Sequence, residues 1–228
     1  MSKLPNLSHR HKVCIICEGF EDYEYIHHLL ELRVWNEIYE FIPINAKSAS
    51  NVFARYQDAF SNDKYEIVLV FCDTDKEPYR EYAQIKSKIN QFHNYRNASG
   101  KVIIFANPCT MQIVLSHFGD VVLKNQGKKT NSSTIFDLTG VANYDAHENQ
   151  IKEICSKIYR RTYPEMKSRI AKMNHGDTVS GSTNFIVHIE NFESDNSKWI
   201  EAVNKALDIV NVKRKCTKRA SENVQFRR

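Results

Sequence analysis

Long apolar stretches, an apolar leader and internal repeats are all missing from this sequence of 228 residues. No apolar run approaches the roughly 18–20 residues that span a bilayer, which argues against a transmembrane helix. The first twelve residues are polar and basic, and the apolar core of a secretion signal does not follow them. We therefore expect a cytoplasmic protein that makes no membrane contact.

A nucleotide-binding loop is also missing. The stretch Gly127-Lys128-Lys129-Thr130 has the ending of a P-loop, but it lacks the earlier glycine and the buried strand that precedes such a loop. The chain therefore has no credible ATP site of its own. If ATP matters to its activity, a partner protein has to supply the site.

The six cysteines give no metal or redox motif. Cys14 and Cys17 have the spacing of a CxxC pair, but both lie in an apolar run that is typical of a strand. Residues i and i+3 of a strand point to opposite faces, whereas a redox CxxC pair begins a helix. We expect Cys14, Cys17 and Cys72 to be small buried side chains of the core.

What the sequence does contain is an alternation of strand-like and helical patterns over its first 118 residues. Strands are predicted at 12–17, 40–44, 66–72 and 101–106, and helices at 21–34, 50–60, 78–95 and from 108 onwards. This alternation predicts an α/β fold, with a Rossmann-like parallel sheet, helices on both faces and right-handed crossovers.

After Gly119 the pattern changes. We predict an exposed polar loop over 124–133, helical periodicity over 149–172, another loop over 174–183, a strand or helix over 184–189, and a last amphipathic helix over 199–210. Residues 1–119 are thus expected to form the catalytic core. Residues 120–228 are expected to form a mostly helical, basic region packed on that core.

Positive charge is unevenly distributed, although the net charge is only +5. Residues 213–219 and 227–228 are strongly basic, and so is the helical pattern that carries Arg160, Arg161 and Lys167. A solvated surface with a frayed tail would explain this distribution, and so would attraction to a nucleic-acid backbone. The acidic residues described next favour nucleic acid.

Two acidic motifs follow apolar runs that are typical of buried parallel strands. Glu18-Gly19 follows the run 13–17, and Asp73-Thr74-Asp75 follows the run 67–72. In open α/β sheets, ligands bind beyond the carboxyl ends of the strands, so Glu18, Asp73 and Asp75 are expected to share one crevice. A hard divalent cation such as Mg²⁺ would offset their mutual repulsion. The alternative is that these carboxylates only cap helices and face solvent.

This pair of motifs resembles the Toprim domain of topoisomerases, primases and overcoming-lysogenization-defect (OLD) nucleases. The stretch from Asn107-Pro108-Cys109 to His117-Phe118 is similar to a segment of RloB-like proteins, a Toprim branch encoded in prokaryotic defence or restriction loci. The similarity covers residues 12–118. It implies a metal-dependent nuclease that cleaves RNA, tRNA included, or DNA, and that acts as an antiviral effector.

The resemblance also implies roles for individual residues. Glu18 would act as general acid/base or metal ligand, Asp73 and Asp75 would bind Mg²⁺ or Mn²⁺, and Lys76 would contact phosphate. Asn107 would position a water or backbone group, unless it only caps the following helix. Nucleic acid, an ATPase and a second copy of the chain are the expected partners.

Met111 stands where RloB-like proteins often have a glutamate. This departure keeps a second hypothesis open, that of a non-catalytic binding or sensor module with the Toprim fold. A phosphatase of small phosphorylated molecules is a third hypothesis.

Overall fold

The computed structural model describes residues 10–74, 79–123 and 127–207. Its centre is a five-stranded sheet with the order β2-β1-β3-β4-β5. The strands are β1 (His11–Cys17), β2 (Tyr39–Asn45), β3 (Ile67–Asp73), β4 (Ile103–Asn107) and β5 (Ser182–Thr183). The first four strands are parallel, and β5 is antiparallel to β4. The predicted α/β fold with a parallel sheet is confirmed.

The sheet is built from residues that are apolar on both faces. Every residue from Val13 to Cys17 and from Ile67 to Cys72 is buried, as two-sided coverage by helices requires. The parallel register pairs Cys17 with Phe71, and Asp73 with Ala106. The carboxyl ends of β1, β3 and β4 therefore lie side by side at one edge of the sheet.

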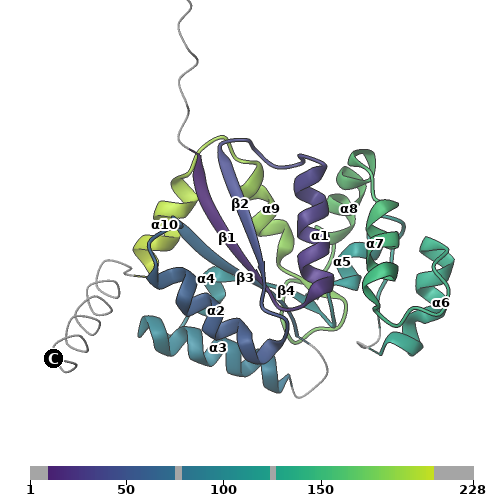
Figure 1. The fold of residues 1–228 in the computed structure, drawn as a ribbon, viewed down its shortest axis with the longest axis horizontal. Coiled ribbons are helices and arrows are strands. Elements are labelled where there is room, and N and C mark those ends of the chain that lie inside the picture. Colours follow the sequence, from purple (N-terminus) through teal and green to yellow (C-terminus); the bar gives the residue numbers. More distant parts are fainter. Residues whose placement is uncertain (1–9, 75–78, 124–126, 208–228) are drawn as a thin grey trace, which may run out of the picture.

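Helices cover both faces of this sheet (Figure 1). In the first half they are α1 (Phe20–Glu31), α2 (Ala49–Ser61), α3 (Arg80–His93), α4 (Ser99–Val102) and α5 (Met111–Leu115). Right-handed crossovers put α1 on one face and the adjacent pair α2 and α3 on the other. The predicted strand over 101–106 starts two residues late, because the short helix α4 occupies residues 99–102.

The second half is mostly helical, as predicted. It contains α6 (Lys128–Thr139), α7 (Glu148–Ser156), the 3₁₀ turn η1 (Arg160–Thr162), α8 (Tyr163–Ile170), α9 (Phe185–Glu193) and α10 (Lys198–Ala206). The exposed loop predicted over 124–133 is wrong from residue 128 onwards, where α6 begins. Asn131, Ile135 and Thr139 are spaced four residues apart and all buried, so one face of this polar sequence is a helix interface.

Three other predictions need adjustment. The helical pattern over 149–172 is two helices interrupted around η1, and the loop predicted over 174–183 ends in the short strand β5. The ambiguous stretch 184–189 is helical and belongs to α9. The last helix is present over Lys198–Ala206, while residues 208–228, with their basic clusters, lie outside the described residues.

An aromatic cluster connects the two halves of the chain. Phe192 of α9 lies with its ring centroid 4.9 Å from those of both Trp35 and Phe41, and 5.9 Å from that of Trp199. The Trp35 indole N–H also donates to the Tyr163 hydroxyl of α8 at 3.0 Å. No helix in the described part of the chain is long and apolar enough to cross a membrane.

Candidate active site

Glu18 and Asp73 meet at the carboxyl edge of the sheet. The Glu18 backbone N–H donates to the Phe71 carbonyl at 3.0 Å, which extends the β1–β3 pairing one residue into the turn. The Glu18 side chain then accepts a hydrogen bond from the Asp73 backbone N–H at 3.2 Å. Both residues are half-buried. The two acidic motifs, 55 residues apart in sequence, are therefore in direct contact.

Asp22 and Thr110 complete this arrangement, and neither was singled out from the sequence. Asp22 is buried and accepts the Gly19 backbone N–H at 2.8 Å, which caps the first turn of α1. Its other carboxylate oxygen accepts a hydrogen bond from the Thr110 hydroxyl. Thr110 also lies against Asp73, whose Oδ1 is 2.7 Å from the Thr110 backbone nitrogen and 3.1 Å from its hydroxyl. Thr110 thus connects the first helix to the third strand.

A further carboxylate, Glu21, lies in the same acidic region. It accepts a hydrogen bond from the Tyr144 hydroxyl at 2.5 Å. Burial, and next the charge of Glu21, raise the pKa of Tyr144 well above its usual value. The pKa of the Cys109 thiol is raised by burial first and then by the charges of Asp73 and Glu21. Cys109 is therefore a neutral thiol within a region of negative potential, and it is not an activated nucleophile.

Arg160 and Arg161, two of the basic residues predicted to bind nucleic acid, lie away from this edge. The carbonyl of Ile158, just before Arg160 and Arg161, accepts a hydrogen bond from His28 near the end of α1. Glu18 instead lies just before the start of α1, so the whole length of this helix separates it from Ile158. A helix of that length is about 18 Å long. Lys167 is paired with Glu193 at 2.5 Å.

Other cations do lie near the acidic residues. Lys47 is exposed just after β2, where the Ala46 N–H donates to the Cys17 carbonyl. Lys152 of α7 is exposed, and its Nζ lies 5.5 Å from the centroid of the Phe20 ring. Phe20 follows Glu18 by two residues, so Lys152 lies near the acidic edge. Lys152 could not be identified from the sequence, because only the packing of α7 on α1 brings it there.

Asn107 and His117, which begin and nearly end the stretch 107–118 singled out in the sequence, have structural partners. Asn107 ends β4, and its side-chain amide donates to the Asp177 carbonyl at 2.9 Å, so it holds the segment before β5. It does not cap the next helix, because Thr110 is the N-cap of α5. His117 is buried between the hydroxyls of Tyr25 and Thr162, and burial lowers its pKa to about 3.

The donor chemistry at this edge fits a hard divalent cation, because Glu18 and Asp73 offer adjacent carboxylates. Asp75 and Lys76 lie outside the described residues. Among those that are described, no group of three or more histidine, cysteine, aspartate or glutamate side chains is arranged to hold a metal ion. Met111 is buried at 3% exposure, so its position contributes packing in place of a carboxylate.

Comparison of the chain with models of protein families, with curated proteins and with solved structures gives no match.

Proposed function

We propose that this protein is a metal-dependent nuclease of the Toprim type, acting on phosphodiester bonds in RNA or DNA. One observation carries the proposal, namely the hydrogen bond between the Glu18 carboxylate and the Asp73 backbone at the carboxyl edge of parallel strands. A glutamate and an aspartate in contact at this edge occupy the position where open α/β folds bind their ligands. The RloB-like resemblance of residues 12–118 adds the expectation of a role in antiviral defence.

Each residue has a role in this proposal. Asp73, Asp75 and Glu18 would hold Mg²⁺ or Mn²⁺, which when bound would stabilise negative charge on the phosphate. Glu18 would exchange a proton at the scissile bond. Thr110 and Asp22 would orient Asp73 and the Glu18 turn, through the contacts described above. Lys47 and Lys152 would attract the phosphate backbone to this edge.

The proposal is tested by cleavage of plasmid DNA, single-stranded DNA and total tRNA, with Mg²⁺, with Mn²⁺ and with EDTA. We expect wild-type protein to cleave at least one substrate only when metal is present. Glu18→Ala and Asp73→Asn should each lower the rate at least a hundredfold, in line with the loss of general acid–base or electrostatic catalysis. Glu37→Ala, which changes a glutamate in the turn before β2, at the opposite edge of the sheet, is the matched control and should cleave normally.

Metal binding gives a second readout that does not depend on the substrate. Mg²⁺ should raise the midpoint of thermal unfolding of the wild-type protein, because a ligand that binds only the folded state stabilises it. This increase should disappear in Asp73→Asn. Cleavage that persists in EDTA, or that is unchanged in both variants, would refute the proposal.

One observation favours the second hypothesis, a non-catalytic nucleic-acid-binding or sensor module. Met111 is buried where the resembling family often has a glutamate, so the acidic set is smaller by one carboxylate. Such a module would bind nucleic acid in EDTA and in Mg²⁺ alike and would cleave neither RNA nor DNA. The same panel of substrates therefore separates the two functions.

A further inference from the structure

Cations lie over aromatic rings at five places in the part of the chain that the structure describes. An aromatic ring beside a cation is the usual component of a site for single-stranded nucleic acid. Two of the five pairs are closed by acids, because Lys86 pairs with Asp177 and Lys167 pairs with Glu193, each at 2.5 Å. In the other three, the cation forms no ion pair with any described residue. These open pairs are Phe20–Lys152, Phe53–Lys88 and Tyr159–Arg161.

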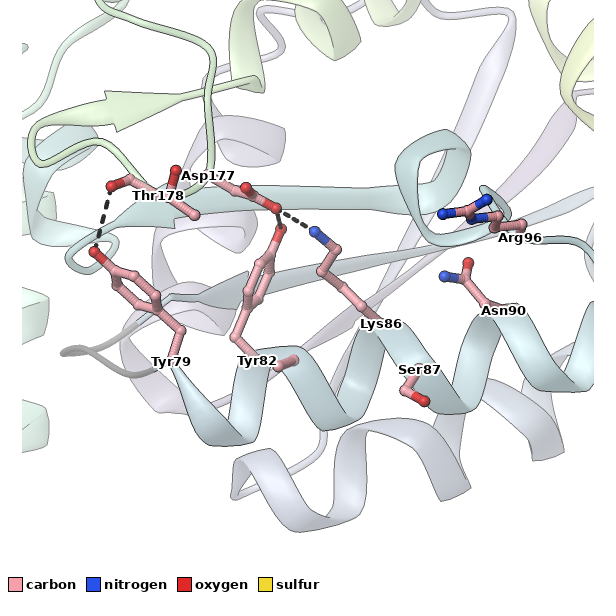
Figure 2. A pocket seen from close by; sticks show the side chains of 9 residues that line it. Tyr79, Tyr82, Lys86, Ser87, Asn90, Arg96, Asp177 and Thr178 are labelled. Carbon is pink, nitrogen blue, oxygen red and sulfur yellow. Dashed lines mark hydrogen bonds and ion pairs between the residues drawn. The ribbon is translucent and has the colours of Figure 1, made fainter.

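The cavity along α3, which contains one of the closed pairs, does not suit a single nucleotide. It has a volume of about 430 Å³ and lies between α3 and residues 177–178. Figure 2 shows Tyr82 and Lys86 directed at Asp177 in its middle, with Tyr79 at one end and Arg96 at the other. The ring of Tyr79 and the charge of Arg96 are therefore separated by the length of α3.

The open pair Phe20–Lys152 lies at the acidic edge. Phe20 is the first residue of α1 and follows Glu18 by two residues, which limits the distance between their Cα atoms to about 7 Å. The Phe20 ring is half-buried and Lys152 is exposed, with its Nζ 5.5 Å from the ring centroid. Part of an aromatic ring and a positive charge therefore face solvent together, next to the carboxylates of Glu18 and Asp73.

The other two open pairs lie elsewhere. Tyr159–Arg161 follows Ile158, whose carbonyl contacts the far end of α1. Phe53–Lys88 joins α2 to α3, on the face of the sheet opposite α1. In this pair too the phenylalanine is half-buried and the lysine is exposed. Phe53–Lys88 therefore has the same chemistry as the pair at the acidic edge, in a different place.

We propose that Phe20 and Lys152 form a platform for one unpaired nucleotide, with its base stacked on the Phe20 ring and its phosphate bound by Lys152. Every base has a π-face, so an aromatic ring binds bases of any sequence. The ammonium of Lys152 ends a flexible stem and can turn from the ring to a phosphate. A cation is needed here, because the charges of Asp73 and Glu21 make the potential of this region negative.

The platform selects the class of substrate. A base can stack on a side chain only after it has left the stack of its own duplex. The inference rests on the proposed nuclease function, to which it adds that the nucleotide beside the scissile phosphate is unpaired. The substrate is therefore a single strand, or the single-stranded part of a folded nucleic acid.

The first test is fluorescence anisotropy in EDTA, where no metal-dependent cleavage occurs. Labelled single strands of about 12 nucleotides, as RNA and as DNA, are compared with blunt duplexes of the same sequence. We expect the wild-type protein to bind at least one single strand at least tenfold more tightly than its duplex. Phe20→Leu, which keeps an apolar side chain but removes the ring, should weaken this binding at least fivefold and leave duplex binding within twofold. Phe20→Tyr keeps the ring and should bind as the wild-type protein does.

The role of Lys152 is tested by the salt dependence of the same binding. Each phosphate contact with a single strand contributes about 0.7 to the slope of log K against log[salt]. Lys152→Ala should lower the slope by about this amount, whereas Phe20→Leu removes no charge and should leave the slope unchanged. Phe53→Leu and Lys88→Ala, which alter the equivalent pair on α2 and α3, are the matched controls. They should change the affinity less than twofold and leave the slope unchanged.

Three results would overturn the inference. The first is a loss of single-strand binding in Phe53→Leu that is as large as the loss in Phe20→Leu. The second is an equal weakening of single-strand and duplex binding in Phe20→Leu, because the ring would then contribute only to the fold. The third is a wild-type protein that binds neither single strand more tightly than the corresponding duplex.

Cleavage assays run in parallel separate this inference from the proposed function. Metal-dependent cleavage with an unchanged KM in both Phe20→Leu and Lys152→Ala would overturn the platform and leave the nuclease standing. Single-strand binding that depends on Phe20 and Lys152, without cleavage in any metal, would refute the nuclease and support the platform as part of a binding module.

Discussion

At the scale of single residues, Thr110 holds the two acidic motifs in place. Its backbone N–H donates to Asp73, and its hydroxyl lies between a carboxylate oxygen of Asp73 and one of Asp22. A hydroxyl has only one proton, so it can donate to one of these two acids at a time. The position of Asp73 relative to α1 therefore depends on a side chain that carries no charge.

Replacing Thr110 with valine should damage both stability and the site. The shape of the side chain is kept, but the buried carboxylate of Asp22 loses a hydrogen-bond donor. We expect the free energy of unfolding to fall by about 1–3 kcal/mol, the usual cost of leaving a buried group unsatisfied. We also expect a clear loss of metal-dependent cleavage. Urea unfolding and the cleavage assay measure the two effects, and Thr110→Ser, which keeps the hydroxyl, should retain most of both. A fully active and equally stable Thr110→Val would refute this role.

The contact between Glu18 and Asp73 could be predicted from sequence because it follows from the topology. Both residues end buried parallel strands, and such ends meet at one edge of a sheet. Asp22 and Thr110 could not be predicted in the same way. Asp22 has the ordinary pattern of an acid in the first turn of a helix, and Thr110 is a neutral residue in a connection. Only the folded chain shows that the two side chains meet.

At the scale of elements, Asn184 completes the sheet beyond the end of β5. Its side-chain oxygen accepts the Phe105 backbone N–H at 2.8 Å, and its side-chain nitrogen donates to the Ile103 carbonyl at 2.7 Å. These are the two kinds of bond that a neighbouring strand would make with β4. One amide side chain therefore replaces a strand at this edge and directs the chain into α9.

Asn184→Ala should loosen this edge of the sheet. It leaves the Phe105 N–H without its partner and removes one of the donors to the Ile103 carbonyl, which His188 also contacts, and we expect a loss of about 1–3 kcal/mol in the free energy of unfolding. Amide hydrogen exchange should show the largest loss of protection at Phe105. Asn97→Ala is the matched control, because this exposed asparagine donates to no described backbone carbonyl. Unchanged exchange at Phe105 would show that Asn184 is not what holds β4.

The elements of the first half were predictable because their apolar residues recur with clear periods. The strands β1 and β3 are continuous apolar runs, and α2 has its buried residues at helical spacing. The element α6 was missed because its sequence is almost entirely polar, and its helix is stabilised by the burial of one face. The two-residue strand β5 has no periodicity at all. Its place beside β4 depends on hydrogen bonds that Thr183 and Asn184 make with Phe105, about 80 residues earlier in the sequence.

At the scale of the whole molecule, the boundary expected near residue 119 does not separate two cores. The aromatic cluster packs Trp35 and Phe41 from the first half against Phe192 and Trp199 from the second. The strand β5, also from the second half, pairs with β4. These contacts couple the described parts of both halves, so we expect them to unfold together.

Three buried histidines make this joint stability sensitive to acid. Burial lowers the pKa of His93 to about 4, that of His117 to about 3 and that of His188 to about 4. The unfolded chain has the ordinary value of about 6.5 for each. Below pH 6.5 the unfolded state therefore binds protons that the folded state does not. The stabilisation is complete above pH 6.5 and is lost as the pH falls towards 4 and 3.

The free energy of unfolding should therefore fall steeply between pH 6.5 and 4. Each histidine contributes up to about 1.4 kcal/mol per pH unit, so the three together contribute up to about 4 kcal/mol per pH unit. Urea unfolding at a series of pH values measures this slope. Carboxylates also titrate here, so the deciding comparison is between variants. His117→Gln should reduce the slope by about a third, whereas the exposed His27→Gln should leave it unchanged. The burial of His117 between Tyr25 and Thr162 is the reason to expect that it takes up a proton only in the unfolded chain. An equal slope in all three proteins would contradict this expectation, because His117 would then bind protons equally in both states.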